Sequence, residues 1–211
     1  MIGRVQANLE TIYDLQTELR AQEFLVTPEA ARALGYTGRS TEELLVRQDG
    51  EDLELALYLA PEVLARLAPF ENAPTEHLVD GALEAFLHVA EGVSHFLYLT
   101  RAAEHGRRVS MLELEAQAEI DKFALCVLSG WRRGVAWAEH LLRRLFKWVS
   151  FLPTLRAEER WRYEEANRIS RNYCARLVRH VARDRMDRFL SDLRYSYRLG
   201  AEAKLRHLAA E

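Results

Sequence analysis

The pattern of apolar and polar positions divides the chain into a mixed N-terminal part and a helical remainder. Residues 4–20 carry apolar groups at helical spacing, and 23–27 (EFLVT) are predicted to form a short strand. Pro28 can begin a helix that Gly35 would end. From about residue 74 onward the spacing is helical throughout. It predicts helices over 75–104, 111–129, 134–152 and 156–199, the last with a break, and then a short tail helix.

The clearest local pattern is a β-hairpin around Asp49-Gly50. Asp-Gly supplies the positive φ angles that a type I′ turn requires. In the following residues, leucines at every second position alternate with Asp52, Glu54, Ala56 and Tyr58. This alternation predicts a hairpin with one buried face, which the helices before and after it would cover.

Together these elements predict an α+β fold that is predominantly α. Residues 1–70 would form a small helix/β-hairpin module, and residues 74–211 an antiparallel bundle of four to five helices, because short connections favour antiparallel neighbours. Ser110, followed three residues later by Glu113, is a capping box that marks the start of the helix over 111–129.

Acidic and histidine side chains line one face of the helix predicted over 75–104. Glu84, His88, Glu91 and His95 follow one another at steps of four, three and four, opposite an apolar face. An exposed helical face usually includes Lys or Arg, and residues 76–100 contain neither. Three interpretations stay open: a solvated face, an internal network with the arginine-rich C-terminal helices, or a metal site.

Two polar stripes run along the helix predicted over 111–129. Glu113, Gln117 and Asp121 have the spacing of an ordinary outer stripe. A second stripe lies between two apolar lines and should be partly buried, where carboxylates need a cation, a donor or a proton. It consists of Glu115, Glu119 and Lys122.

A metal site would combine side chains of these two helices. Carboxylates and imidazoles spaced three and four residues apart can reach one ion, as in metal-binding helical bundles. The ion would be iron, manganese or zinc, and the activity hydrolytic or oxidative. We expect Glu115 to orient an imidazole from the second shell of ligands. The expected ligands are Glu84, His88, Glu91, His95 and Glu119.

The formal net charge of −3 conceals a strong asymmetry. Residues 1–130 carry a net −12, whereas residues 131–211 carry +9. Such a basic half can bind nucleic acid or an acidic partner. Ten acidic residues interrupt the basic half, which argues against nucleic acid and favours pairing with carboxylates of the same chain or of a second copy.

Aromatic and arginine side chains supply the candidates for an interaction surface. The segment 131–152 is strongly amphipathic, and Trp148 falls on its apolar side, so we interpret it first as a core helix. The alternative is a protein interface, where Trp and Arg are favoured anchors. The candidate interface residues are Trp131, Trp137, Trp148, Arg168, Arg171 and Arg179.

The functional expectation is a non-enzymatic, cytoplasmic interaction protein, an adaptor or scaffold that self-associates. We expect its partner to be another protein or a second copy, with no cofactor and no membrane span. Nucleotide-binding glycine loops and nucleophile motifs are missing from the sequence. Cys126 and Cys174 lie inside helical patterns without metal-ligand spacing and are expected to be buried apolar groups.

Overall fold

The computed structural model describes residues 1–49, 52–149 and 155–210. It is predominantly helical with one small sheet, which confirms the α+β fold class. The chain forms two compact units, one of Met1–Glu10 with Gln16–Arg107 and one of Thr11–Leu15 with Arg108–Glu211. The predicted boundary at 70–74 lies inside the first unit. Separate domains over 1–70 and 74–211, and four to five bundle helices, stay predictions.

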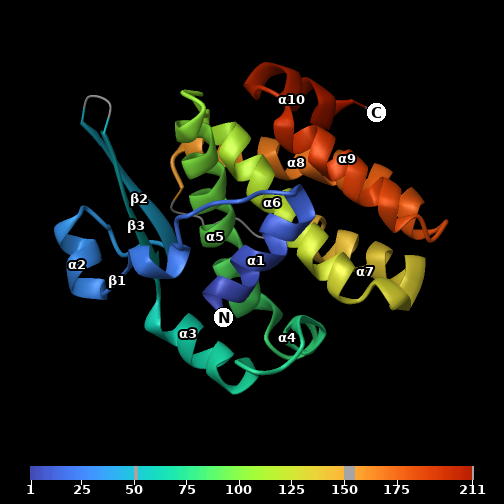
Figure 1. Cartoon of the computed structure of the whole chain (residues 1–211), viewed down its shortest axis with the longest axis horizontal. Helices are drawn as coiled ribbons and strands as arrows, with labels where there is room; N and C mark the ends of the chain where they lie inside the picture. Colours follow the sequence, from blue (N-terminus) through green and yellow to red (C-terminus); the bar gives the residue numbers. More distant parts are fainter. Residues whose placement is uncertain (50–51, 150–154, 211) are drawn as a thin grey trace. The chain divides into compact units, whose positions relative to one another are not determined.

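The first unit combines a three-stranded sheet with helices. The strands are β1 (Leu25–Val26), β2 (Glu42–Asp49) and β3 (Asp52–Leu59), in the order β1-β3-β2. β1 pairs parallel to β3, and β2 antiparallel to it, so that β2 and β3 form the hairpin in Figure 1. The helices are α1 (Ile2–Tyr13), α2 (Pro28–Ala33), α3 (Pro61–Leu67), α4 (Thr75–Gly81) and α5 (Leu83–Glu104), with short 3-10 turns at Ala21–Phe24 and Ala68–Phe70.

The hairpin is confirmed, but its burial differs from the predicted pattern. Residues 56–59 of β3 are buried on both faces, because α5 packs on the sheet and Tyr36 covers Tyr58 with ring centroids 4.2 Å apart. Farther from this end of the hairpin, Val46 and Glu54 are exposed. Strand pairing extends to Asp49 opposite Asp52. The predicted turn at Asp49-Gly50 involves Gly50, which lies outside the described residues.

Three predicted helix boundaries are wrong. α1 ends at Tyr13, not near residue 20, and the next residue, Asp14, has a positive φ of 55°. The single helix predicted over 75–104 is interrupted at Ala82, whose φ of −146° and ψ of 37° separate α4 from α5. The helix predicted over 134–152 ends at Phe146.

In the second unit, the long helix α8 contacts four other helices. Its elements are α6 (Met111–Ser129), α7 (Gly134–Phe146), α8 (Ala157–Val181), α9 (Met186–Arg198) and α10 (Ala201–Ala209), with a 3-10 turn at Trp131–Arg133. α8 packs against α6, α7, α9 and α10. The predicted break falls between α8 and α9 (Figure 1). Asp184, in this connection, has a φ of 49°. Cys126 and Cys174 are fully buried and unpaired, as predicted.

Candidate functional site

The acidic and histidine face of α5 runs from solvent into the interior of the first unit. Glu84 is exposed and lies 3.9 Å from Arg66 of α3. His88 is half-buried, and the Thr41 hydroxyl oxygen lies 3.1 Å from each of its ring nitrogens. His95 is buried, with Nδ1 3.6 Å from a carboxylate oxygen of Glu42. The stripe is therefore solvated only at its N-terminal end.

Sequence reasoning missed that the start of β2 faces α5. The close approach depends on Gly92 of α5. A Cβ built there would lie 2.8 Å from Leu57 Cδ1 and 3.0 Å from Glu42 Cγ. A glycine inside a long helical pattern was the one available signal, because such a residue often marks a close packing contact.

The predicted metal ligands belong to two helices, one in each unit. Glu84, His88, Glu91 and His95 lie on α5, and Glu91 is half-buried. Glu115 and Glu119 lie on α6. Glu119 accepts a hydrogen bond from Lys122 at 2.8 Å, as its spacing predicted. Metal binding by these residues stays a prediction.

Glu115 lies beside an arginine, as expected for an internal network with the arginine-rich C-terminal helices. This buried carboxylate lies 3.8 Å from Nε of Arg162, on the arginine-rich helix α8. A guanidinium beside a buried carboxylate reduces the cost of removing both charges from water. Arg162 of the basic half therefore compensates one buried acidic group within the second unit.

The stripe of Glu113, Gln117 and Asp121 was expected on the outside of α6, and that expectation is wrong. All three side chains are buried. The Ser110 cap forms as predicted, with its hydroxyl accepting from the Glu113 amide at 3.2 Å. Gln117 and Asp121 face inward because other polar side chains of the second unit hydrogen-bond to them.

Gln117 and Asp121 belong to a buried hydrogen-bond network with Tyr13 and Lys204. Tyr13 donates its hydroxyl proton to Asp121. Gln117 donates to Tyr13 at 3.0 Å and to Asp121 at 2.6 Å, and Lys204 donates to the Gln117 carbonyl. The Lys204 ammonium lies 5.4 Å from the centroid of the Tyr197 ring, which stacks on Tyr13 at 4.1 Å. Donors, acceptors and one cation thus satisfy one another in the interior.

The network holds its tyrosine in the neutral form. Burial and the Asp121 carboxylate raise the pKa of Tyr13 well above its usual value, so the phenol keeps its proton and donates it. Sequence reasoning missed Lys204. Lys204 lies four residues before Leu208, and residues four apart share one face of a helix. Because Leu208 is fully buried, Lys204 lies on the inward face of α10.

The four tryptophans, all in the second unit, differ in how far they are exposed. Trp131 donates to Asp184 at 2.7 Å and meets Phe189 edge-to-face. The Trp137 ring contacts Arg133 and stacks on His140. In contrast, Trp148 is 63% exposed and Trp161 is 58% exposed. The expectation that Trp148 packs in the core is wrong, because α7 ends two residues before it.

Exposed cations accompany Trp148 at the end of α7. Arg143, Arg144 and Lys147 are exposed, and the described residues contain no ion-pair partner for any of them. Trp161 lies near the start of α8, which packs against α7. We call Arg143, Arg144, Lys147, Trp148 and Trp161 the exposed-tryptophan surface.

The predicted interface arginines lie on the exposed side of α8. Arg168 makes two hydrogen bonds to Glu165, at 2.8 and 2.7 Å. Arg179 donates to the Arg176 carbonyl at 3.1 Å, and Arg171 is exposed. One of the three guanidinium groups is thus neutralised by a neighbouring carboxylate, as the interspersed acidic residues suggested.

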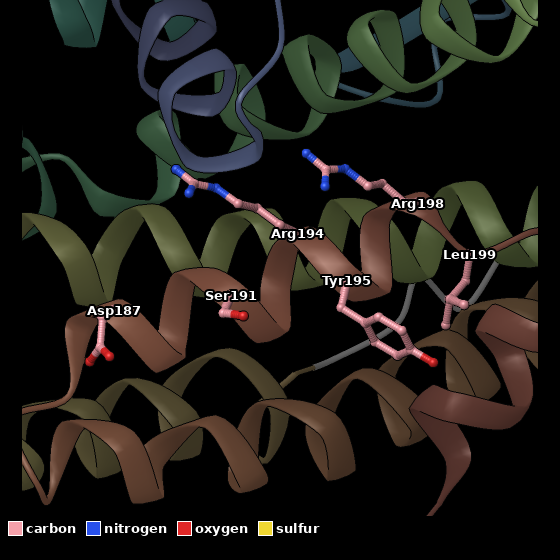
Figure 2. Close-up of a pocket in the computed structure, with 6 residues that line it drawn as sticks. All are labelled: Asp187, Ser191, Arg194, Tyr195, Arg198 and Leu199. Carbon is pink, nitrogen blue, oxygen red and sulfur yellow. The ribbon is translucent and has the colours of Figure 1, made fainter.

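A groove of about 410 Å³ lies along α9. Figure 2 shows Arg194 and Arg198 extending to one side of the helix, and Tyr195 and Leu199 on the other. Arg194 is already engaged, because it donates to the carbonyls of Ile12 at 2.8 Å and Thr11 at 3.1 Å. Arg198 lies 3.9 Å from Asp14. The arginines of this groove therefore hold the end of α1.

Comparison of the chain with known proteins identifies no relative. No protein-family model, curated protein or solved structure matches the chain. Within the described ranges, no helix is long and apolar enough to cross a membrane. Function must therefore be inferred from the surfaces of the molecule itself.

Proposed function

We propose that this is a non-enzymatic interaction protein that binds an acidic protein partner through the exposed-tryptophan surface. One observation carries the proposal: two indoles, Trp148 and Trp161, are each more than half exposed. Tryptophan is usually well buried, and it is among the residues that contribute most binding energy at protein interfaces. Exposure of two such side chains is unfavourable unless a partner covers them.

The charge of the surface favours an acidic partner. Arg143 and Arg144 lie in the last turn of α7 and Lys147 directly follows it, all three exposed, and residues 131–211 carry a net +9. Basic surfaces steer acidic partners into encounter and reject basic ones. Cations also interact favourably with the carbonyl end of a helix, so part of this cluster stabilises α7 itself. That effect does not account for the exposed indoles.

The proposal is tested with a Trp148→Ala, Trp161→Ala double variant. Proteins captured from a cell extract by wild-type protein but not by this variant would be identified, purified and titrated by calorimetry. We expect the variant to weaken binding at least about tenfold, since each interface tryptophan contributes roughly 2 kcal/mol or more. A Met186→Ala, Tyr195→Ala variant removes exposed side chains elsewhere in the same unit and should bind normally. Equal affinity of wild type and tryptophan variant would refute the proposal.

A metal-binding role is the second candidate, favoured by the buried pair His95 and Glu42. Imidazole and carboxylate are the donors that zinc, manganese and iron accept. Plasma mass spectrometry of protein purified without chelator would test it, with a His88→Ala, His95→Ala variant as the comparison. Near-stoichiometric metal that disappears in the variant would support this role. A metal-free wild type would exclude it.

A further inference from the structure

β2 is an edge strand, and the backbone groups on its outer side can pair with another strand. The sheet order is β1-β3-β2, so β2 has a neighbour on one side only. Throughout the described ranges, no backbone hydrogen bond joins β2 to any segment other than β3. Alternate residues of an edge strand direct their N–H and C=O groups outward, where another strand can pair with them. The other edge strand, β1, has only two residues.

Natural proteins usually protect such an edge with charges. β2 carries four charged residues, of which Glu43 and Arg47 have opposite signs. Glu43 and Arg47 lie four residues apart, so they share one face of the strand. Glu42 faces α5. Because side chains alternate between the two faces of a strand, Glu43, Leu45 and Arg47 lie on the opposite face. Between the charges the strand is apolar, with the sequence LLV, and Val46 is 49% exposed.

This sequence is complementary to itself in one antiparallel arrangement. With a two-fold axis at Leu45, Glu43 of each copy lies opposite Arg47 of the other, and Leu44 opposite Val46. If the axis moves to Leu44, Glu43 meets a leucine. If it moves to Val46, Arg47 meets a leucine. Opposite charges and apolar pairs directly across two strands are favourable, whereas like charges are not. Only the axis at Leu45 satisfies both charges.

We propose that two copies of the chain associate through β2 in this register, forming one continuous sheet across the dimer. The interface is isologous, since the same strand serves both copies and the assembly closes at two. Arg47 already lies 2.7 Å from Glu54 of β3, and its five donors allow it to pair with a second carboxylate as well. In the dimer Arg47 would lie between Glu54 and Glu43 of the second copy.

The first test changes the charges of β2 and measures dimerisation of the full chain by sedimentation equilibrium. We expect wild type to dimerise and Glu43→Arg to weaken the dimer at least about tenfold, because both charge pairs become repulsive. A Glu43→Arg, Arg47→Glu, Glu54→Arg triple variant reverses every charge in the row and should restore dimerisation. A wild type that stays monomeric at about 200 µM, where even micromolar association would show, would overturn the proposal. So would a Glu43→Arg variant that dimerises normally, or a triple variant that does not recover.

The register is tested by cross-linking. Leu45→Cys places two thiols opposite each other at the axis and should form an intermolecular disulfide on mild oxidation. Val46→Cys is the matched control, since Val46 lies opposite Leu44 and not opposite itself. The native cysteines are buried and should not contribute. Equal cross-linking of both variants would refute this register.

Dimerisation through β2 and partner binding through the exposed-tryptophan surface can fail separately. The Trp148→Ala, Trp161→Ala variant should dimerise as wild type does, because neither indole lies on β2. Loss of the dimer in that variant would contradict the β2 assignment.

Discussion

At the scale of single residues, Gly92 allows α5 to approach the sheet closely. We expect Gly92→Ala to destabilise the protein by about 1–2 kcal/mol. The added methyl group would lie 2.8 Å from the fully buried Leu57, and overpacking of this kind costs roughly 1–3 kcal/mol. The higher helix propensity of alanine recovers up to about 1 kcal/mol. Urea denaturation followed by circular dichroism measures the difference.

Gly3→Ala is the matched control. Gly3 also lies in a helix, but its nearest obstacle is the exposed, flexible side chain of Gln22, 3.1 Å from the added Cβ. We expect this variant to be neutral or slightly more stable than wild type. Equal stability changes at positions 3 and 92 would show that close packing against β3 is not the reason for glycine at position 92.

At the scale of elements, several arginines complete helix ends. Arg176 of α8 donates to the carbonyls of His207, Leu208 and Ala210 at the end of α10. Arg194 of α9 does the same for the end of α1. The last carbonyls of a helix have no partner within it, and a guanidinium can satisfy two or three at once. Part of the arginine content therefore has a structural role within the chain.

We expect Arg194→Lys to destabilise the protein by about 1–2 kcal/mol. Lysine keeps the charge but lacks the planar fork that donates to two carbonyls simultaneously, and each lost hydrogen bond costs roughly 1 kcal/mol. Thermal unfolding would measure the change. Arg188→Lys, on the same helix but exposed and 3.9 Å from its acidic neighbour, should change stability by less than about 0.5 kcal/mol. A smaller loss at position 194 than at 188 would contradict the capping role.

The accuracy of the sequence predictions depended on whether the deciding interaction was local. The helix at Met111–Ser129, its Ser110 cap and the β-hairpin follow from neighbouring residues, and all three are confirmed. The inward orientation of Gln117 depends on Lys204, 87 residues away, and the environment of His95 depends on Glu42. Periodicity distinguishes polar from apolar faces, but it does not identify which distant side chains will satisfy a polar face.

At the scale of the whole molecule, α1 belongs to both compact units. Its residues up to Glu10 lie in the first unit, and Thr11–Tyr13 lie in the second. If one unit opened alone, this helix would be interrupted near its last turn. Isolated helical segments shorter than about 12 residues are marginal in water, so the part of α1 left in the closed unit would lose stability when the other part unfolds. We therefore expect the two units to unfold together.

The cysteines provide the measurement, because both lie in the second unit. Burial raises the pKa of Cys126 to about 12 and that of Cys174 well above its usual value, so neither thiol reacts at pH 8 until the unit opens. We expect Gly92→Ala, a change in the first unit, to lower the urea concentration at which both thiols become reactive. The shift should equal that of the circular dichroism midpoint. Unchanged thiol protection beside a lowered dichroism midpoint would mean that the first unit unfolds by itself, and that continuity of α1 does not couple the two.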